Sequence, residues 1–173
     1  MLKYIKEGKI KVDPTKNPEK MTFHDSCNNA RSCGFYEEPR ELLGLVSMDF
    51  QEMYPNRAEN YCCTGGGGAM SMSEYTPRRL KSASVKVAQL QETEAEIVVT
   101  SCHNCVDGLT DVIKHYKLNM KVVQLIHLFA NAMAIITRCR NPPLSWNGYS
   151  SIRRSGLGIP TLPSISIVCA RAS

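Results

Sequence analysis

The chain has 173 residues, of which 43% are hydrophobic and 21% charged, so it is long enough for one folded domain and is neither disordered nor collagen-like in composition. Its formal net charge is +5, but the five arginines beyond residue 133 account for that excess, and the first 133 residues hold sixteen basic and sixteen acidic side chains. Because no clustered basic face is expected, nucleic-acid binding is excluded. Neither a membrane span nor export is expected, since no apolar run is long enough and the amino-terminal stretch does not read as a signal peptide.

The predicted elements alternate short apolar strands with amphipathic helices. Pro39 lies in the first turn of one expected helix, and Thr76 is the expected N-cap of another, with Pro77 at its first helical position. This alternation predicts an α/β fold, a mainly parallel sheet flanked by helices. In chain order, the expected elements are a strand at 20–23, helices at 37–46 and 76–91, a strand at 96–100, a helix at 102–117, a strand at 121–125 and a helix at 126–132.

The composition divides the chain into three parts. Residues 1–19 form a lead-in, and residues 20–133 form the predicted cysteine-rich domain. Residues 134–173 contain no Lys, Asp or Glu and show neither helical nor alternating periodicity. They are expected to be an irregular tail, either a flexible extension or a non-native end, and no function is assigned to them.

Five of the eight cysteines lie in three short segments at predicted strand ends. Cys27 follows the first strand, Cys62 and Cys63 are adjacent, and Cys102 and Cys105 form a CxxC after the EIVVT strand. The carboxyl ends of parallel strands and the following helix amino termini form the crevice where ligands bind in open α/β sheets. Free backbone N–H groups at such helix ends favour an anion, such as a thiolate or a negatively charged cluster.

The number of thiols points to an unusual metal site, because tetrahedral zinc and an ordinary four-iron cubane each need only four. Spacing alone leaves iron-sulfur and structural zinc equally open, since thiolate-rich sites suit both metals. A thioredoxin-type CxxC is a third alternative. A phosphate-binding loop is disfavoured, because GGGGAMSM matches neither of the glycine-rich nucleotide motifs.

Four segments together carry a family resemblance: HDSCNNAR, EEPRELL, CCTGGGGAM and TSCHNCVDGL. Over residues 20–133 they resemble the cysteine-rich CCG domain of the B-type subunits of heterodisulfide reductase and their relatives, and most closely the Hmc- and Dsr-type iron-sulfur subunits of sulfate reducers. Thr64 departs from the pattern, because the family has glycine directly after the paired cysteines. The ferredoxin-type cysteine runs that family members usually carry upstream are also absent. The chain therefore resembles the carboxyl-terminal part of a longer protein.

The resemblance implies a redox function, which is either electron transfer to a disulfide-type substrate or reductive cleavage of its sulfur–sulfur bond. It implies a four-iron (4Fe-4S) cluster, cubane or non-cubane, and partners that are other subunits of a membrane redox complex, with a disulfide or a small redox protein as acceptor. It implies a cytoplasmic location at the inner face of the membrane, held there by partner subunits. The implied cluster ligands are Cys27, Cys62, Cys63, Cys102 and Cys105.

Other residues of these motifs have expected supporting roles. The glycine run, Gly65, Gly66, Gly67 and Gly68, would let the backbone approach the cluster sulfurs and direct N–H groups at them, unless it is an ordinary turn. His103 lies between two expected ligands and is the candidate proton donor to a leaving thiolate, with a bystander role as the alternative. His24 and Asp25 are expected to orient the first cysteine loop by hydrogen bonds.

Two other functions stay open at this point. One is an electron relay whose cluster never touches a substrate. The other is a zinc-stabilised interaction domain without redox chemistry.

Overall fold

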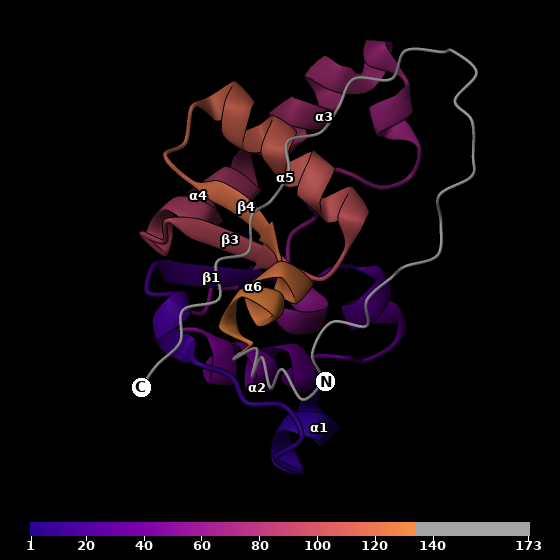
Figure 1. The fold of residues 1–173 in the computed structure, drawn as a ribbon. Helices are drawn as coiled ribbons and strands as arrows, with labels where there is room; N and C mark the ends of the chain where they lie inside the picture. Colours follow the sequence, from indigo (N-terminus) through magenta and orange to yellow (C-terminus); the bar gives the residue numbers. More distant parts are fainter. Residues whose placement is uncertain (134–173) are drawn as a thin grey trace, which may run out of the picture. The chain divides into compact units, whose positions relative to one another are not determined.

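A computed structural model of the protein, shown in Figure 1, describes residues 1–133. Four strands form one sheet in the order β2-β1-β3-β4, and each neighbouring pair is parallel. This confirms the predicted α/β fold with a parallel sheet. The strands are β1 (Lys20–His24), β2 (Asp49–Phe50), β3 (Ile97–Thr100) and β4 (Lys121–Gln124).

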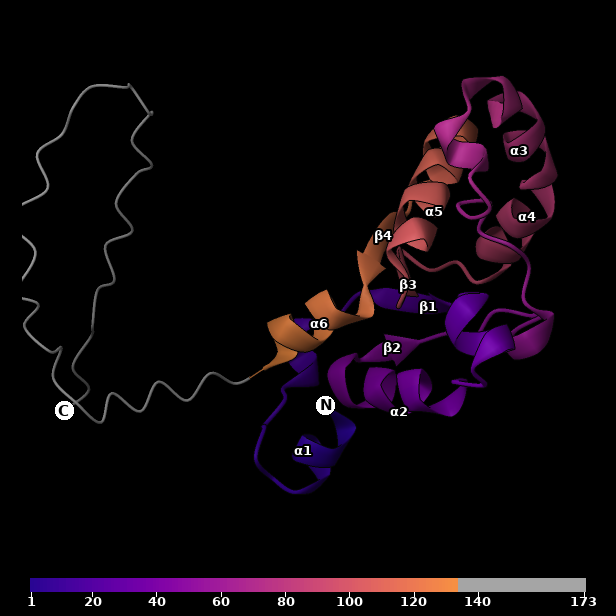
Figure 2. The same ribbon diagram turned by 90° about the vertical axis from the view of Figure 1, so that its right-hand side faces the viewer.

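Helices cover both faces of this sheet. Figures 1 and 2 show α3, α4 and α5 on one side and α1, α2 and α6 on the other. The helices are α1 (Leu2–Lys6), α2 (Glu37–Val46), α3 (Thr76–Ser82), α4 (Ser84–Glu92), α5 (His103–Tyr116) and α6 (Leu125–Ala132). Short 3-10 turns and one π-helical segment, η2 (Asn28–Ser32), fill the connections.

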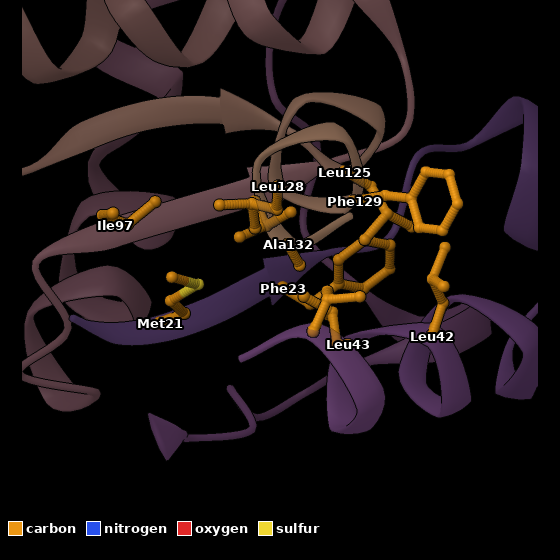
Figure 3. Close-up of a cluster of buried hydrophobic side chains, with 11 residues drawn as sticks. Met21, Phe23, Leu42, Leu43, Ile97, Leu125, Leu128, Phe129 and Ala132 are labelled. Atoms are coloured by element: carbon orange, nitrogen blue, oxygen red, sulfur yellow. The ribbon is translucent and has the colours of Figure 1, made fainter. Parts of the chain in front are cut away.

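The central strands bury both of their faces, which explains their nearly continuous apolar sequences. Met21 and Phe23 of β1 pack with Ile97 of β3 and with side chains of α2 and α6 in one apolar cluster (Figure 3). Val98 points to the opposite face and packs with Leu109 of α5. Alternate side chains of one strand thus anchor different helix layers, which holds the ends of β1 and β3 side by side.

The predicted helix at 76–91 is instead two helices that meet at Ala83. The Leu80 carbonyl accepts hydrogen bonds from the Ala83 N–H at 3.1 Å and from the Tyr116 hydroxyl at 3.0 Å. These bonds close a tighter turn at this position, and Tyr116 belongs to α5, so the break depends on a distant element. The expected N-cap was also wrong: Thr76 is the first residue of α3, and no side chain caps that helix.

Two elements were not expected from the sequence. The edge strand β2 has only two residues, too few to show alternation, and α1 lies in the expected lead-in. No helix in residues 1–133 combines the length and the apolar character that crossing a membrane requires. The expected tail at 134–173, with Cys139 and Cys169, lies outside the described residues.

Candidate metal centre

Three buried side chains of types that can bind a metal ion meet where the strands end. They are His24, the last residue of β1, Cys63 in the loop before α3, and Cys105 in the first turn of α5. The Sγ atoms of Cys63 and Cys105 are 3.0 Å apart, and one ligand atom from each of the three residues lies within 4.8 Å of the others. Segments separated by about forty residues of chain thus converge on one point.

The parallel register explains this convergence. His24 pairs with Thr100, so β1 and β3 end level with each other. Cys102 follows β3 and is the extended residue that precedes α5. It packs against the apolar cluster that contains Cys63 and Cys105. The sheet therefore holds in place both His24 at the end of β1 and the cysteine segment that follows β3.

Cys62 and Cys63 share the loop that faces α5. The N–H of Thr64 donates to Cys62 Sγ at 3.2 Å, and the N–H of Gly65 donates to Cys63 Sγ at 3.4 Å. Cys63 is buried, whereas Cys62 is exposed and lines an open pocket of about 420 Å³. The pair therefore presents one sulfur to the interior and one to the surface.

Crowding of the thiols disfavours their charged forms. The Cys105 thiol raises the pKa of Cys63 to about 11, and the Cys63 thiol raises the pKa of Cys62 above its ordinary value. A thiophilic metal removes this conflict, because it displaces the protons and binds the thiolates together. Cysteine sulfurs in contact, with backbone N–H groups directed at them, fit a metal ion or an iron-sulfur cluster.

The fifth candidate, Cys27, is connected to this loop through Arg31. Nη1 of Arg31 donates to Cys27 Sγ at 2.7 Å, and its Nε donates to the Ala58 carbonyl at 2.7 Å. Arg31 also donates to the carbonyl of Asn60, two residues before Cys62. The guanidinium thus joins the first cysteine loop to the segment that leads into the paired cysteines.

A buried ion pair supports the same two loops. Asp25 accepts hydrogen bonds from Arg40 of α2 at 2.9 and 2.7 Å, and from the backbone N–H of Arg57 at 2.7 Å. Glu52 binds the other edge of the Arg40 guanidinium. Asp25 therefore holds the chain after β1 against the chain before Cys62, in keeping with its expected orienting role.

The glycine run contacts α5 backbone to backbone. A Cβ on Gly65 would lie 2.0 Å from the Asn104 carbonyl oxygen, and a Cβ on Gly108 would lie 2.6 Å from the Cys63 oxygen. Gly67 and Gly68 have positive φ, and so does Thr64, with φ of 62°. Gly65 therefore allows the cysteine loop to approach the helix that carries Cys105, while Gly66 has open space around it. Gly108 was not singled out from the sequence.

His103 lies apart from the buried trio. Its side chain is 77% exposed, and its two ring nitrogens lie 3.3 Å from Gln124 Nε2 and 3.7 Å from an Asp107 carboxylate oxygen. The proton-donor role of His103 remains a prediction.

Two buried residues outside the four sequence motifs, Asn60 and Lys86, lie near the candidate metal centre. Asn60 and Lys86 are completely or almost completely buried, and Lys86 Nζ donates to Asn60 Oδ1 at 2.7 Å. Asn60 Nδ2 lies 3.1 Å from His24 Nδ1. Nothing in the helical pattern of 84–92 distinguishes Lys86 from an exposed lysine, so the sequence could not identify it.

These features define a class of protein: an α/β domain with a cysteine-rich, metal-binding type of centre at the carboxyl ends of its strands. A model of the cysteine-rich CCG domain family matches residues 21–110, and the chain belongs to that family. No solved structure matches the chain.

Curated relatives are redox proteins by name. The chain is 32% identical over 109 residues to a probable membrane-anchored ferredoxin of Chromohalobacter salexigens, covering 63% of this chain and 16% of the relative. It is 28% identical over 138 residues to the Hdr-like menaquinol oxidoreductase iron-sulfur subunit of Archaeoglobus profundus, covering 76% of this chain and 25% of the relative.

A third relative is one of the subunits of the dihydromethanophenazine:CoB–CoM heterodisulfide reductase of Methanosarcina mazei. It is 30% identical over 135 residues, which cover 78% of this chain and 32% of the relative. The chain thus spans no more than about a third of the length of these relatives.

Proposed function

We propose that the chain is an iron-sulfur redox domain of a larger oxidoreductase, formed by residues 20–133. The observation that carries this proposal is the 3.0 Å contact between Cys63 and Cys105, with buried His24 beside them. Membership of the CCG family and the names of the relatives support iron-sulfur over zinc. The proposed cluster ligands are Cys27, Cys62, Cys63, Cys102 and Cys105.

The proposed cofactor is a four-iron cluster, because five cysteines exceed the four that a cubane needs and the extra thiolate suits a bridging or non-cubane arrangement. When bound, such a cluster supplies transfer of single electrons. The protein contributes the N–H donors of Thr64 and Gly65 to two of the sulfurs.

The proposed reaction is delivery of electrons to a disulfide-type substrate or its reductive cleavage. One disulfide consumes two electrons and two protons and gives two thiols, so the site must admit substrate and supply protons. The pocket beside Cys62 provides access and is lined by Thr64, Gly66 and Arg78 among others. His103 is the proposed proton donor.

The proposed setting is a complex of several subunits at the cytoplasmic face of a membrane. Relatives named as a membrane-anchored ferredoxin and as an iron-sulfur component of a menaquinol oxidoreductase support it. Partner subunits would bring electrons to this domain.

Metal analysis tests the proposal directly. Protein purified without oxygen is expected to contain iron and acid-labile sulfide, and to give an electron paramagnetic resonance signal on reduction or oxidation. About one zinc per chain with neither iron nor sulfide would contradict the redox function and favour a zinc-stabilised interaction domain.

Serine variants test the proposed ligands. Cys→Ser at position 27, 62, 63, 102 or 105 is expected to reduce iron and sulfide content. Cys33→Ser is a matched control, because Cys33 is exposed and lies outside the proposed ligand set. Cys139→Ser and Cys169→Ser are also expected to leave the content unchanged, and a loss equal to that of the five would show that the ligand set is wrong.

A relay without substrate chemistry is the second candidate, favoured by the relative named as a ferredoxin. A change in the cluster spectrum on addition of a disulfide or trisulfide would support substrate chemistry. Redox cycling that no such compound affects would support the relay.

A further inference from the structure

Lys86 is a lysine with no exposed surface, and its ammonium has only uncharged partners in the described part of the chain. Its Nζ donates to the side-chain oxygens of Asn60 and Gln89, and lies 3.6 Å from Met53 Sδ. A buried charge is costly unless an opposite charge lies nearby. An anion that compensates the positive charge of Lys86 is therefore expected close to it.

The Asp25 carboxylate does not fill this role. Asp25 is already engaged by two hydrogen bonds from the Arg40 guanidinium and one from the Arg57 backbone. Burial lowers the pKa of Lys86 to about 7, whereas negative charge on Cys63, Asp25 and Cys62 acts in the opposite direction. The sulfurs of Cys62 and Cys63, which become thiolates when a metal displaces their protons, are thus the remaining anions within electrostatic reach.

A continuous hydrogen-bond path leads from Lys86 to that centre. Asn60 accepts the Lys86 hydrogen bond through Oδ1, and its Nδ2 contacts both His24 Nδ1, at 3.1 Å, and the Asp25 carbonyl oxygen. A carbonyl oxygen only accepts, so the amide orientation is set: Nδ2 donates to both His24 and Asp25.

This orientation determines the tautomer of His24. Nδ1 accepts from Asn60, so the ring proton of neutral His24 is on Nε2. Nε2 is buried and has no hydrogen-bond partner among residues 1–133, and a ring nitrogen of His24 lies within 4.8 Å of the Cys63 and Cys105 sulfurs. An unpaired N–H at this position is suited to donate to sulfur that carries negative charge.

We propose that Lys86, acting through Asn60 and His24, is a positioning residue that stabilises negative charge on the sulfur centre and thereby raises its reduction potential. This inference rests on the proposed redox function. Reduction adds one electron to the centre, and a buried positive charge, little screened by salt, favours the more negative state. His24 acts in this arrangement as an N–H donor rather than as a metal ligand.

The test is the midpoint potential of the full 173-residue protein at pH 6, below the pKa of Lys86, measured by an anaerobic redox titration that is monitored by electron paramagnetic resonance. Lys86→Met removes the charge with little change in volume. We expect the equilibrium constant for one-electron reduction to fall at least tenfold, which lowers the potential by at least about 59 mV. Lys81→Met is the matched control, because Lys81 is exposed on α3 and the change in charge is the same.

A second variant keeps the lysine and cancels its charge. Gln89→Glu introduces a carboxylate against Lys86 Nζ with almost no change in shape, so it opens no cavity if Lys86→Met fails to fold. It is expected to lower the potential as Lys86→Met does. Gln91→Glu is its control, since Gln91 is exposed on the same helix.

The outcomes separate this inference from the proposed function. Lowered potentials in the two buried variants, with both controls near wild type, would support the role of Lys86. An unchanged potential in either buried variant with an intact cluster would overturn that role and leave the redox function standing. Wild-type protein without iron and sulfide would instead refute the proposed function itself.

Discussion

At the scale of single residues, a buried ion pair lies next to the cysteine loops. The side chains of Asp25 and Arg40 are 1% and 8% exposed, and they form a bidentate ion pair. A buried pair of this kind contributes little net stability over an apolar pair, but loss of one partner leaves an uncompensated charge. Its effect is therefore to fix the positions of the loops after β1 and β2.

Arg40→Met tests this interpretation. It leaves the Asp25 carboxylate buried without its partner, so the free energy of unfolding is expected to fall by about 3–5 kcal/mol. Urea denaturation of the metal-free protein at pH 7 measures the change. Glu37→Gln is the control, because it removes an ion pair of Arg57 in which Glu37 is 70% exposed, and it is expected to cost under about 1 kcal/mol. Equal losses in the two variants would refute a special role for the buried pair.

At the scale of elements, the centre depends on close contact between the cysteine loop and α5. Gly65 and Gly108 meet backbone to backbone, with no room for a methyl group on either residue. This contact brings Cys63 next to Cys105. Helix α5 carries Cys105, and its surface also determines how closely the opposite loop approaches.

Gly108→Ala is expected to separate these two elements. Its Cβ would lie 2.6 Å from the Cys63 oxygen and from the Gly65 nitrogen, so the backbone must move. We expect a loss of about 1–3 kcal/mol in the free energy of unfolding and reduced iron content in the same preparation. Gly44→Ala in α2 is the matched helical glycine, with open space around it, and is expected to gain about 0.5–1 kcal/mol. Wild-type stability and iron content in Gly108→Ala would contradict the packing argument.

At the scale of the whole molecule, two buried bases link folding to pH. Burial lowers the pKa of Lys86 from 10.5 to about 7, and it lowers the pKa of His24 well below 6.5. Between pH 7 and 10.5 the unfolded chain holds a proton on Lys86 that the folded, metal-free protein has lost. Stability of the metal-free protein therefore rises with pH in this window, until the raised pKa values of Cys62 and Cys63 oppose the rise above about pH 9.

The expected slope between pH 7 and 9 is at most about 1.4 kcal/mol per pH unit, which corresponds to one proton. Denaturation of the metal-free protein at a series of pH values measures it. Lys86→Met is expected to flatten the slope in this window. The loss of stability as the pH falls below 6.5, which the lowered pKa of His24 causes, should persist in this variant. A slope that Lys86→Met leaves unchanged would show that another group is responsible.

The amino-acid sequence by itself determined the α/β fold, the parallel sheet and the family. Apolar runs with helical or strand periodicity are local signals, and the helix at 37–46 is reproduced with the same limits. The cysteine motifs are also local, because each combines a few residues around a strand end or loop. Their joint occurrence identified the CCG family, which the match over residues 21–110 bears out.

Only the tertiary structure decided which residues surround the cysteines. The break at Ala83 depends on a hydrogen bond from Tyr116, the approach of Gly65 depends on Gly108, and the environment of Lys86 depends on Asn60. Each pair is separated by more than twenty residues of chain, and no local pattern encodes such a contact. Hydrogen bonds and backbone contacts between distant segments form only when the sheet aligns its strand ends, which is why the buried lysine and the tautomer of His24 emerge from the folded molecule alone.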